Sequence, residues 1–395
     1  MKIENIRIEN FRSLENIEIS NVPSLCIIVG ANGSGKSTLF NVFGFLKDCL
    51  TYNVSRAMQS RGGYAEIVSR GKLGQDIIIE IQYRMDITGK ERLVTYRLEL
   101  GLVNNKPCVK REILRYKRGA SGSPYHFLDF AQGKGKAVIN EEDFSKTDEE
   151  LTKEDQELEP DILAIKGLGQ FQRFNAANAL RQLIEGWHIS DFHINQARGS
   201  KEDSGFADHL SVSGENLPLV AKTIYDNHPK LFAKILEQMK KRIPGIGTIT
   251  PESTQDGRLL LKFHDKKFSD PFIDRYVSGG TIKMFAYLVL LYDPKPFPLL
   301  CIEEPENQLY PKLMWEIVEE FRDYARRGGQ VFVSTHSPDL LNAAEIDEVF
   351  WLQKKEGYTK IYRASENEQV RKYVEAGDQL GYLWKEGFFT GADPQ

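Results

Sequence analysis

The sequence predicts an α/β fold whose central sheet is buried on both faces. Three apolar runs support this prediction: residues 25–29, residues 299–302 and the run "QVFVST" that begins at Gln330. A continuous apolar run of this length is typical of a strand in a parallel sheet that is covered on both faces. Ligand sites in open α/β sheets lie at the carboxyl ends of the strands. We therefore expect the functional residues directly after these three runs.

The first run continues into a glycine-rich loop and then into a helix. The loop is "GANGSGKST" at 30–38, and apolar residues at helical spacing follow from Leu39 to Leu46. In this context the pattern G-x-x-x-x-G-K-[ST] predicts a phosphate-binding loop, because its glycines allow backbone N–H groups to surround phosphate oxygens at a helix N-terminus. Lys36 would reach the β- and γ-phosphates of ATP, and Ser37 would bind Mg²⁺. The candidate ATP-binding residues of this loop are Asn32, Gly33, Ser34, Gly35, Lys36, Ser37 and Thr38.

The second run ends in two adjacent carboxylates, Glu303 and Glu304. Unpaired buried charge is costly, so a buried strand that ends in this way has a reason to do so. Phosphate-loop enzymes need a carboxylate on a neighbouring strand to hold Mg²⁺, and a second group to orient the attacking water. We predict that Glu303 holds Mg²⁺ and that Glu304 is the catalytic residue that polarises the water. Glu303 is one methylene longer than the Asp that is usual at its position.

Two further stretches add candidate residues. His336 follows the third run, where an imidazole can hydrogen-bond the γ-phosphate and the attacking water. The stretch "YVSGGTIK" places Ser278, Gly279 and Gly280 before a strongly apolar helix, and small residues at a helix N-terminus favour anion binding. The chain already has one phosphate-binding loop. We therefore expect this second one to contact a nucleotide held by another copy of the chain.

Taken in order, the phosphate-binding loop, "SGG", the acidic strand end and the late histidine resemble the head of an ABC-type ATPase. "IENFRSLENIEI", "EEPENQLYP" and "STHSPDLL" resemble the SMC/RecF/OLD branch, and the chain as a whole resembles small bacterial AAA-type ATPases that share this head. The resemblance implies a P-loop NTPase with a mixed central sheet, an N-terminal antiparallel β subdomain and a helical insertion. It also implies ATP and Mg²⁺ as cofactors, and a dimer in which "SGG" acts across the interface.

The resemblance implies three more features of the site. Arg12 matches the arginine of "NFRS", a nucleotide-contacting position in these heads. Gln170 in "GLGQFQRF" is the candidate for the glutamine that contacts Mg²⁺, with Gln59 and Gln196 as alternatives. "VSGGTIK" departs from the transporter-like "LSGGQ".

The chain divides into three predicted parts. Residues 1–140 hold the phosphate-binding loop and, around 76–120, alternating segments typical of antiparallel strands. Residues 141–243 hold a densely acidic segment at 141–161, expected to be a solvated helix or mobile loop, and a mostly helical stretch. Residues 244–395 carry "SGG", the acidic strand end and His336. No heptad run is long enough for a coiled-coil arm.

Composition narrows the class of partner. Lys and Arg number 52 against 56 Asp and Glu, a net charge of −4, which argues against coating nucleic acid by bulk charge. The basic groups at 240–242 and 326–327 could contact DNA, although such runs are more often solvated faces. Four cysteines without C-x-x-C spacing predict reduced, buried thiols and a cytoplasmic protein. No apolar run approaches the ~20 residues that span a bilayer, so we expect no membrane contact.

These observations predict a dimerising ATPase whose nucleotide state gates DNA or an effector protein such as a nuclease. The family resemblance implies a role in bacterial DNA repair or phage defence. Two alternatives remain. The first is the ATP-binding subunit of an ABC transporter, which "NFRS" and "EEPE…STHSP" disfavour. The second is an ATP-sensing scaffold with little turnover.

Overall fold

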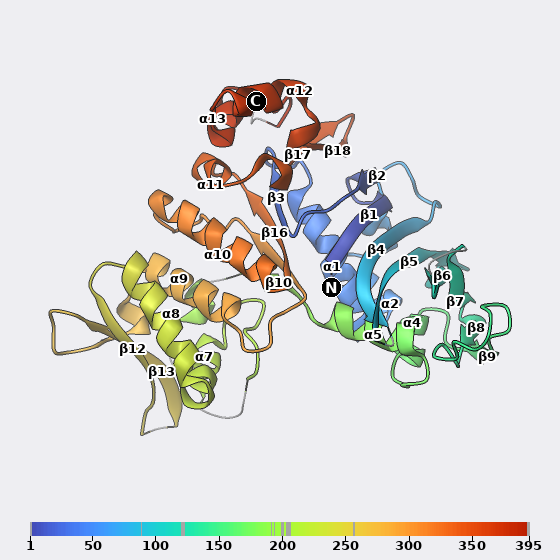
Figure 1. Cartoon of the computed structure of the whole chain (residues 1–395), viewed down its shortest axis with the longest axis horizontal. Helices are drawn as coiled ribbons and strands as arrows, with labels where there is room; N and C mark the ends of the chain where they lie inside the picture. Colours follow the sequence, from blue (N-terminus) through green and yellow to red (C-terminus); the bar gives the residue numbers. More distant parts are fainter. Residues whose placement is uncertain are drawn as a thin grey trace.

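A six-stranded sheet forms the centre of the chain (Figure 1). The computed structural model describes residues 2–392 except 88, 120–122, 191, 193, 199, 200, 203–206 and 256. The first five strands of this sheet are parallel and the sixth is antiparallel. This confirms the mixed central sheet and the three predicted strands. In spatial order the strands are β10 (Trp187–Ser190), β15 (Leu299–Glu303), β16 (Gln330–Thr335), β3 (Leu25–Val29), β17 (Val349–Lys355) and β18 (Tyr358–Arg363).

Both faces of the central sheet are buried, each in a separate core. In β3, Cys26 and Ile28 pack into the core shared with α1 (Lys36–Thr51), whereas Leu25, Ile27 and Val29 pack into the core shared with α9 (Gly279–Leu291) and α10 (Met314–Arg326). A strand with a core on each side gains from an apolar residue at every position. This explains the uninterrupted apolar runs of the sequence.

An eight-stranded antiparallel sheet covers the α1 side of the molecule. Along β4, Ile77, Ile79 and Ile81 are buried, while the residues between them are only half-buried, as expected for a sheet with one face on the core. The predicted N-terminal antiparallel subdomain is confirmed. Its strands are β2 (Leu14–Ile19), β1 (Lys2–Phe11), β4 (Ile77–Ile87), β5 (Lys90–Val103), β6 (Lys106–Tyr116), β7 (Tyr125–Ala131), β8 (Lys134–Val138) and β9 (Lys153–Glu157). Short helices pack near it: α2 (Val54–Gln59), α3 (Tyr64–Ile67), α4 (Ala164–Leu168) and α5 (Asn175–Glu185).

The acidic segment 141–161 differs from the expected solvated helix or loop. It contains β9, the edge strand of the eight-stranded sheet, which pairs with β8. The strand has no apolar residue ("KEDQE"), so hydrophobic periodicity could not reveal it. Charged side chains suit an edge strand because they discourage pairing with another chain.

A third, smaller sheet and several helices lie on the other side of the central sheet, beside α9 (Figure 1). The strands are β11 (Lys201–Glu202), β13 (Arg258–Asp265), β12 (Ile246–Ser253) and β14 (Phe272–Ile273), and the helices are α6 (Ile194–Ala197), α7 (Leu217–Asn227) and α8 (Pro229–Arg242). The C-terminal helices are α11 (Pro338–Asn342), α12 (Glu368–Glu375) and α13 (Leu380–Lys385). Short 3-10 turns occupy Asp274–Tyr276, Pro311–Leu313, Ile346–Glu348 and Ala364–Glu366.

The predicted boundaries at 140 and 243 stay a prediction. The strands β9 and β10 lie between these boundaries, but each belongs to a sheet whose other strands come from outside residues 141–243. All four cysteines are free and buried, as predicted. Among the described helices, none combines the length and the apolar composition needed to cross a membrane.

Candidate active site

Two glycines shape the loop that joins β3 to α1. Gly33 and Gly35 have φ angles of 76° and 109°, in the left-handed region that favours glycine. A Cβ atom on Gly35 would lie 2.3 Å from Thr359 Oγ1, so the tight packing of the loop excludes a side chain there. The first turn of α1 contains no acidic residue, which leaves the positive end of the helix dipole available to an anion.

Thr359 of β18 holds this loop in place. Its Oγ1 donates to the carbonyl of Ser34 at 2.7 Å and lies 2.9 Å from Ser13 Oγ, while its backbone N–H donates to the carbonyl of Ser13 at 2.8 Å. The Thr359 side chain is fully buried. Thr359 therefore holds the loop, and Ser13 in turn holds Thr359. Sequence reasoning missed Thr359, because nothing in "GYTKIYR" marks it.

We expect Thr359→Val to weaken ATP binding about fivefold and to cost about 1 kcal/mol of unfolding free energy. The substitution keeps the shape of the side chain but removes one buried hydrogen bond to the loop. Calorimetric titration with ATP and urea unfolding would measure both effects. Thr250→Val, on β12, is the matched control, and equal ATP affinities for the two variants would contradict the bracing role.

Lys36 and Ser37 open α1 beside the acidic strand end. Lys36 Nζ donates to the carbonyls of Gly30 at 2.7 Å and Ala31 at 3.2 Å. Burial lowers the pKa of Lys36, and the nearby carboxylates of Glu304, Glu303 and Glu306 oppose that shift. Glu303 ends β15, and Glu304 and Glu306 follow it. The sequence predicted a strand next to β3, but β16 lies between β15 and β3.

The chemistry of these groups fits a Mg²⁺ ion. Ser37 Oγ donates to Glu303 Oε2 at 2.6 Å, so a hydroxyl and a carboxylate, both hard oxygen donors, meet at the mouth of the loop. Within the described ranges no three His, Cys, Asp or Glu side chains converge on one point. Mg²⁺ commonly binds through one or two protein oxygens together with waters and substrate phosphates, which agrees with this sparse donor set.

Glu304 occupies a turn with constrained geometry. Its φ of 43° is unusual for a residue other than glycine, and its backbone N–H donates to the carbonyl of Ser334 at 3.0 Å. Asn307 Nδ2 donates to Glu304 Oε2 at 2.9 Å. Backbone strain of this kind clusters at functional sites, where the surrounding contacts must hold it.

His336 lies next to Glu304, with Nε2 3.3 Å from Glu304 Oε1, within ion-pair distance but without the geometry of a good hydrogen bond. Burial and then the charge of Lys36 lower the pKa of His336 below its usual value, so the imidazole is neutral at pH 7. The arrangement joins a carboxylate that can accept a proton to a neutral imidazole that can orient water.

Two residues that sequence reasoning missed support this turn. Glu306 Oε1 accepts hydrogen bonds from Thr335 Oγ1 at 2.8 Å and from the His336 N–H at 2.7 Å. Lys283 Nζ donates to the carbonyls of Asn307 at 2.8 Å and Glu304 at 3.3 Å. The sequence held a signal for each of these residues. Glu306 belongs to "EEPE", and Lys283 is the one charged residue in "GGTIKMFAYLVLL".

The "SGG" loop lies against the turn at residues 304–309, which carries Glu304 and Glu306 and is called the acidic turn below. Ser278 begins α9 as its N-cap and accepts a hydrogen bond from the Thr281 N–H at 3.2 Å. A Cβ on Gly280 would lie 2.6 Å from the carbonyl oxygen of Gln308, so only glycine allows this approach. Ser278 is exposed, and Gly279 and Gly280 are half-buried. Among the described residues, no hydrogen bond joins these three to the phosphate-binding loop of the same chain.

Arg12 lies close to the phosphate-binding loop, beside Ser13, which contacts Thr359. Its φ is 51°, and its backbone N–H donates to the carbonyl of Ile67 at 2.6 Å. Burial, followed by the charge of Arg61, lowers the pKa of the Arg12 guanidinium. An arginine in an electropositive, half-buried position suits an anionic ligand.

Gln170 lies away from Ser37 and Glu303. Its position corrects the prediction that it contacts Mg²⁺. Its side chain donates to the carbonyl of Lys166, and Lys166 Nζ donates to the carbonyl of Thr51, at the far end of α1. Along α1, which runs from Lys36 to Thr51, a rise of 1.5 Å per residue places that end about 21 Å from Ser37. Gln196 is better placed: it lies on α6, shortly after β10, whose carboxyl end adjoins that of β15. Gln59, at the end of α2, is exposed.

The basic runs proposed for DNA contact are largely paired within the chain. Arg242 donates to Glu320 Oε1 at 2.6 Å and pairs with Glu316 at 3.0 Å. Similar pairs involve Lys241 with Glu237, Arg326 with Asp323, and Arg327 with the carbonyl of Leu291. Arg242 and Arg327 are therefore engaged within the fold. The side chains of Lys241 and Arg326 are 58% and 63% exposed, so DNA contact through these two stays a prediction.

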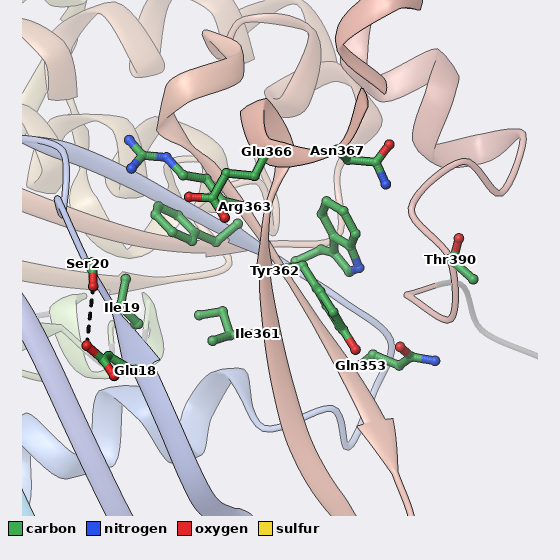
Figure 2. A pocket seen from close by; sticks show the side chains of 12 residues that line it. Glu18, Ile19, Ser20, Gln353, Ile361, Tyr362, Arg363, Glu366, Asn367 and Thr390 are labelled. Atoms are coloured by element: carbon green, nitrogen blue, oxygen red, sulfur yellow. Dashed lines mark hydrogen bonds between the residues drawn. The ribbon is translucent and has the colours of Figure 1, made fainter. Parts of the chain in front are cut away.

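A pocket of about 680 Å³ is formed by a different set of residues (Figure 2). Glu18 and Ser20 line it from the end of β2, and Ile361, Tyr362 and Arg363 line it from β18. None of the predicted site residues lines it.

Comparisons with known proteins agree with this fold. Residues 1–198 match the family described as "AAA ATPase domain", and residues 135–342 match "AAA domain, putative AbiEii toxin, Type IV TA system". The DNA replication and repair protein RecF of Heliobacterium modesticaldum is 21% identical over 378 residues, which cover 88% of this chain and 96% of that protein. RecF of Arthrobacter sp. is 30% identical over 86 residues, 21% of each chain.

Solved structures with the same fold include two SMC heads. One, bound to the C-winged helix domain of ScpA, has a TM-score of 0.56 at 14% identity and covers 94% of this chain and 100% of that one. The other has an extended coiled coil, is bound to the C-terminal domain of ScpA derived from Pyrococcus furiosus, and has a TM-score of 0.53 at 15% identity over 95% and 98% of the two chains. The chain therefore belongs to the AAA ATPase domain family, and its fold is that of an ABC-type ATPase head of the SMC and RecF kind.

Proposed function

We propose that this protein binds ATP with Mg²⁺ and hydrolyses it to ADP and phosphate. The observation that carries the proposal is the meeting of two pairs at one edge of the sheet: Ser37 with Glu303 at 2.6 Å, and Glu304 with His336 at 3.3 Å. The first pair suits a cation between phosphate oxygens, and the second suits an attacking water.

In this proposal each residue has a separate task. The glycines of the loop and the N-terminus of α1 hold the phosphates, and Lys36 neutralises charge on the γ-phosphate. Ser37 and Glu303 would hold Mg²⁺, which would supply further charge stabilisation when bound. Glu304 accepts a proton from the attacking water, while neutral His336 orients that water and the γ-phosphate.

We further propose that two copies of the chain pair on ATP, with Ser278, Gly279 and Gly280 of one copy contacting the nucleotide of the other. The exposure of Ser278 and the dipole of α9 support this contact. The partner of the ATPase would be DNA or an effector protein such as a nuclease, in bacterial DNA repair or phage defence within the cytoplasm. The name of the RecF relatives and the toxin–antitoxin description of one matching family support such a role.

A phosphate-release assay tests the proposal. With ATP and Mg²⁺ the protein should release phosphate, and EDTA should stop the release. Binding of ATP without release would instead identify an ATP-sensing scaffold. Failure to bind ATP at all would refute the proposed function.

Binding to DNA, if it occurs, should be modest without ATP and should weaken steeply with salt, because phosphate contacts release counterions. The net charge of −4 disfavours binding by bulk charge, and the pairing of Arg242 with Glu316 removes one cation from the free surface. Labelled duplex would be titrated at low and moderate salt, with and without a non-hydrolysable nucleotide. Absence of binding in every condition would leave a protein as the sole partner.

A further inference from the structure

Lys283 is a buried cation at the junction of two functional segments. Only 5% of the residue is exposed, and its ammonium donates to the carbonyls of Glu304 and Asn307, the start and middle of the acidic turn. Burial lowers the pKa of Lys283 to about 8, opposed by the charges of Glu306 and Glu304. A buried lysine is costly, so its place within an otherwise apolar helix calls for a specific role.

The same residue ties the turn to the "SGG" loop. Lys283 lies on the first turns of α9, five residues after the N-cap Ser278. Gly280 adjoins the carbonyl of Gln308 on the turn. Arg198 Nη2 holds the chain before Ser278 by donating to the carbonyl of Val277 at 2.6 Å. The start of α9 and the turn that carries Glu304 are therefore joined by a charged hydrogen bond and by close backbone contact.

We propose that Lys283 is a positioning residue that holds Glu304 in its strained backbone conformation and couples Glu304 to the "SGG" loop. The ammonium binds the carbonyl of Glu304 itself, where φ is 43°, and so stabilises a conformation that the chain would otherwise leave. When "SGG" contacts a nucleotide on a second copy, Lys283 links that contact, through α9, to the turn that carries Glu304 of its own chain. The inference rests on the proposed function above.

The test compares Lys283→Met with Lys283→Arg. Methionine keeps an unbranched chain but removes the charge, so kcat should fall about 10- to 100-fold through misplacement of Glu304, with KM for ATP changed less than twofold. Arginine keeps the positive charge and should retain most of the turnover lost in the methionine variant. Lys234→Met on α8, where Lys234 lies over the ring of Tyr292, is the matched control. Wild-type kcat in Lys283→Met would overturn the inference.

The pH profile separates positioning from stability. Wild-type turnover should fall as the pH rises through about 8, where Lys283 loses its proton, while Lys283→Arg should show no such fall. The pKa of this lysine is lower in the folded state, so the unfolded state binds the proton more tightly between about pH 8 and 10.5, and the contribution of Lys283 to stability rises over that range. Loss of turnover there cannot come from unfolding driven by this group. An equal alkaline fall in the arginine variant would contradict the proposal.

Hydrogen exchange gives a readout that does not need catalysis. Backbone amides of residues 304–309 should exchange faster in Lys283→Met than in the wild type or Lys234→Met, without any nucleotide. If the wild type releases no phosphate but this difference is present, the proposed ATPase function fails and the positioning role of Lys283 stands. If exchange is unchanged, the positioning role fails whatever the ATPase result.

Discussion

The Glu304→Gln variant is expected to bind ATP, to hydrolyse it at least about 100-fold more slowly than the wild type, and to accumulate as a dimer. Glutamine preserves the hydrogen bond from Asn307 but removes the negative charge that accepts a proton from water. With the γ-phosphate retained, the contact to Ser278 and Gly280 of the second copy should persist. Phosphate release and light scattering with ATP and Mg²⁺ measure the two effects.

Glu303→Gln is the informative comparison, since it changes the neighbouring carboxylate. Glu303 contacts Ser37 at the proposed Mg²⁺ site, so its loss should shift the Mg²⁺ dependence of turnover and yield less dimer. Glu237→Gln, on the exposed face of α8, controls for the substitution itself. Wild-type hydrolysis by Glu304→Gln would exclude it as the residue that activates water. An inactive variant that binds ATP yet stays monomeric would exclude the two-chain site.

Lys36→Ala is expected to abolish measurable ATP turnover and to weaken ATP binding, because Lys36 is the one lysine or arginine of the loop at 30–38. Stability should change little or rise. Burial already lowers the pKa of this lysine, which means that its charged form is disfavoured in the fold. ATP affinity and melting temperature would be measured together.

Lys240→Ala serves as the control for that experiment, since Lys240 is an exposed lysine of α8, which packs into the core on the opposite face of the central sheet from α1. Normal hydrolysis by a correctly folded Lys36→Ala variant would refute the assignment of the phosphate-binding loop. A collapsed melting temperature would show that the loop depends on the hydrogen bonds from Lys36 to the carbonyls of Gly30 and Ala31.

The parts of the site that sequence could predict are those in which one short segment determines both structure and chemistry. Residues 25–38 specify a buried strand, a glycine-dependent loop and a helix N-terminus without help from the rest of the chain. Glu303 and His336 were predictable for a related reason: each ends a run whose burial on both faces demands a parallel sheet, and the carboxyl ends of parallel strands meet at one edge.

What the sequence could not predict depends on contacts between distant segments. Thr359 matters only because β18 passes beside the loop, and Lys283 matters only because α9 packs on the acidic turn. The prediction for Gln170 failed for the same reason, since the local sequence around Gln170 does not indicate which end of α1 it will lie beside. The edge strand β9 is stabilised by pairing with β8 rather than by apolar burial, so composition concealed it.

The position of β3 in the central sheet has a consequence for how the protein is made. Its two neighbours are β16 and β17, so residues 25–29 pair with strands that begin at 330 and 349. As the ribosome extends the chain, this apolar strand has no native neighbour until more than 300 residues have followed it, while β1 and β2 can pair at once. Non-local pairing of this kind is slow and leaves aggregation-prone surface exposed. The phosphate-binding loop should thus be among the last parts to reach its native structure. Newly made chains should depend on chaperones until β16 and β17 emerge.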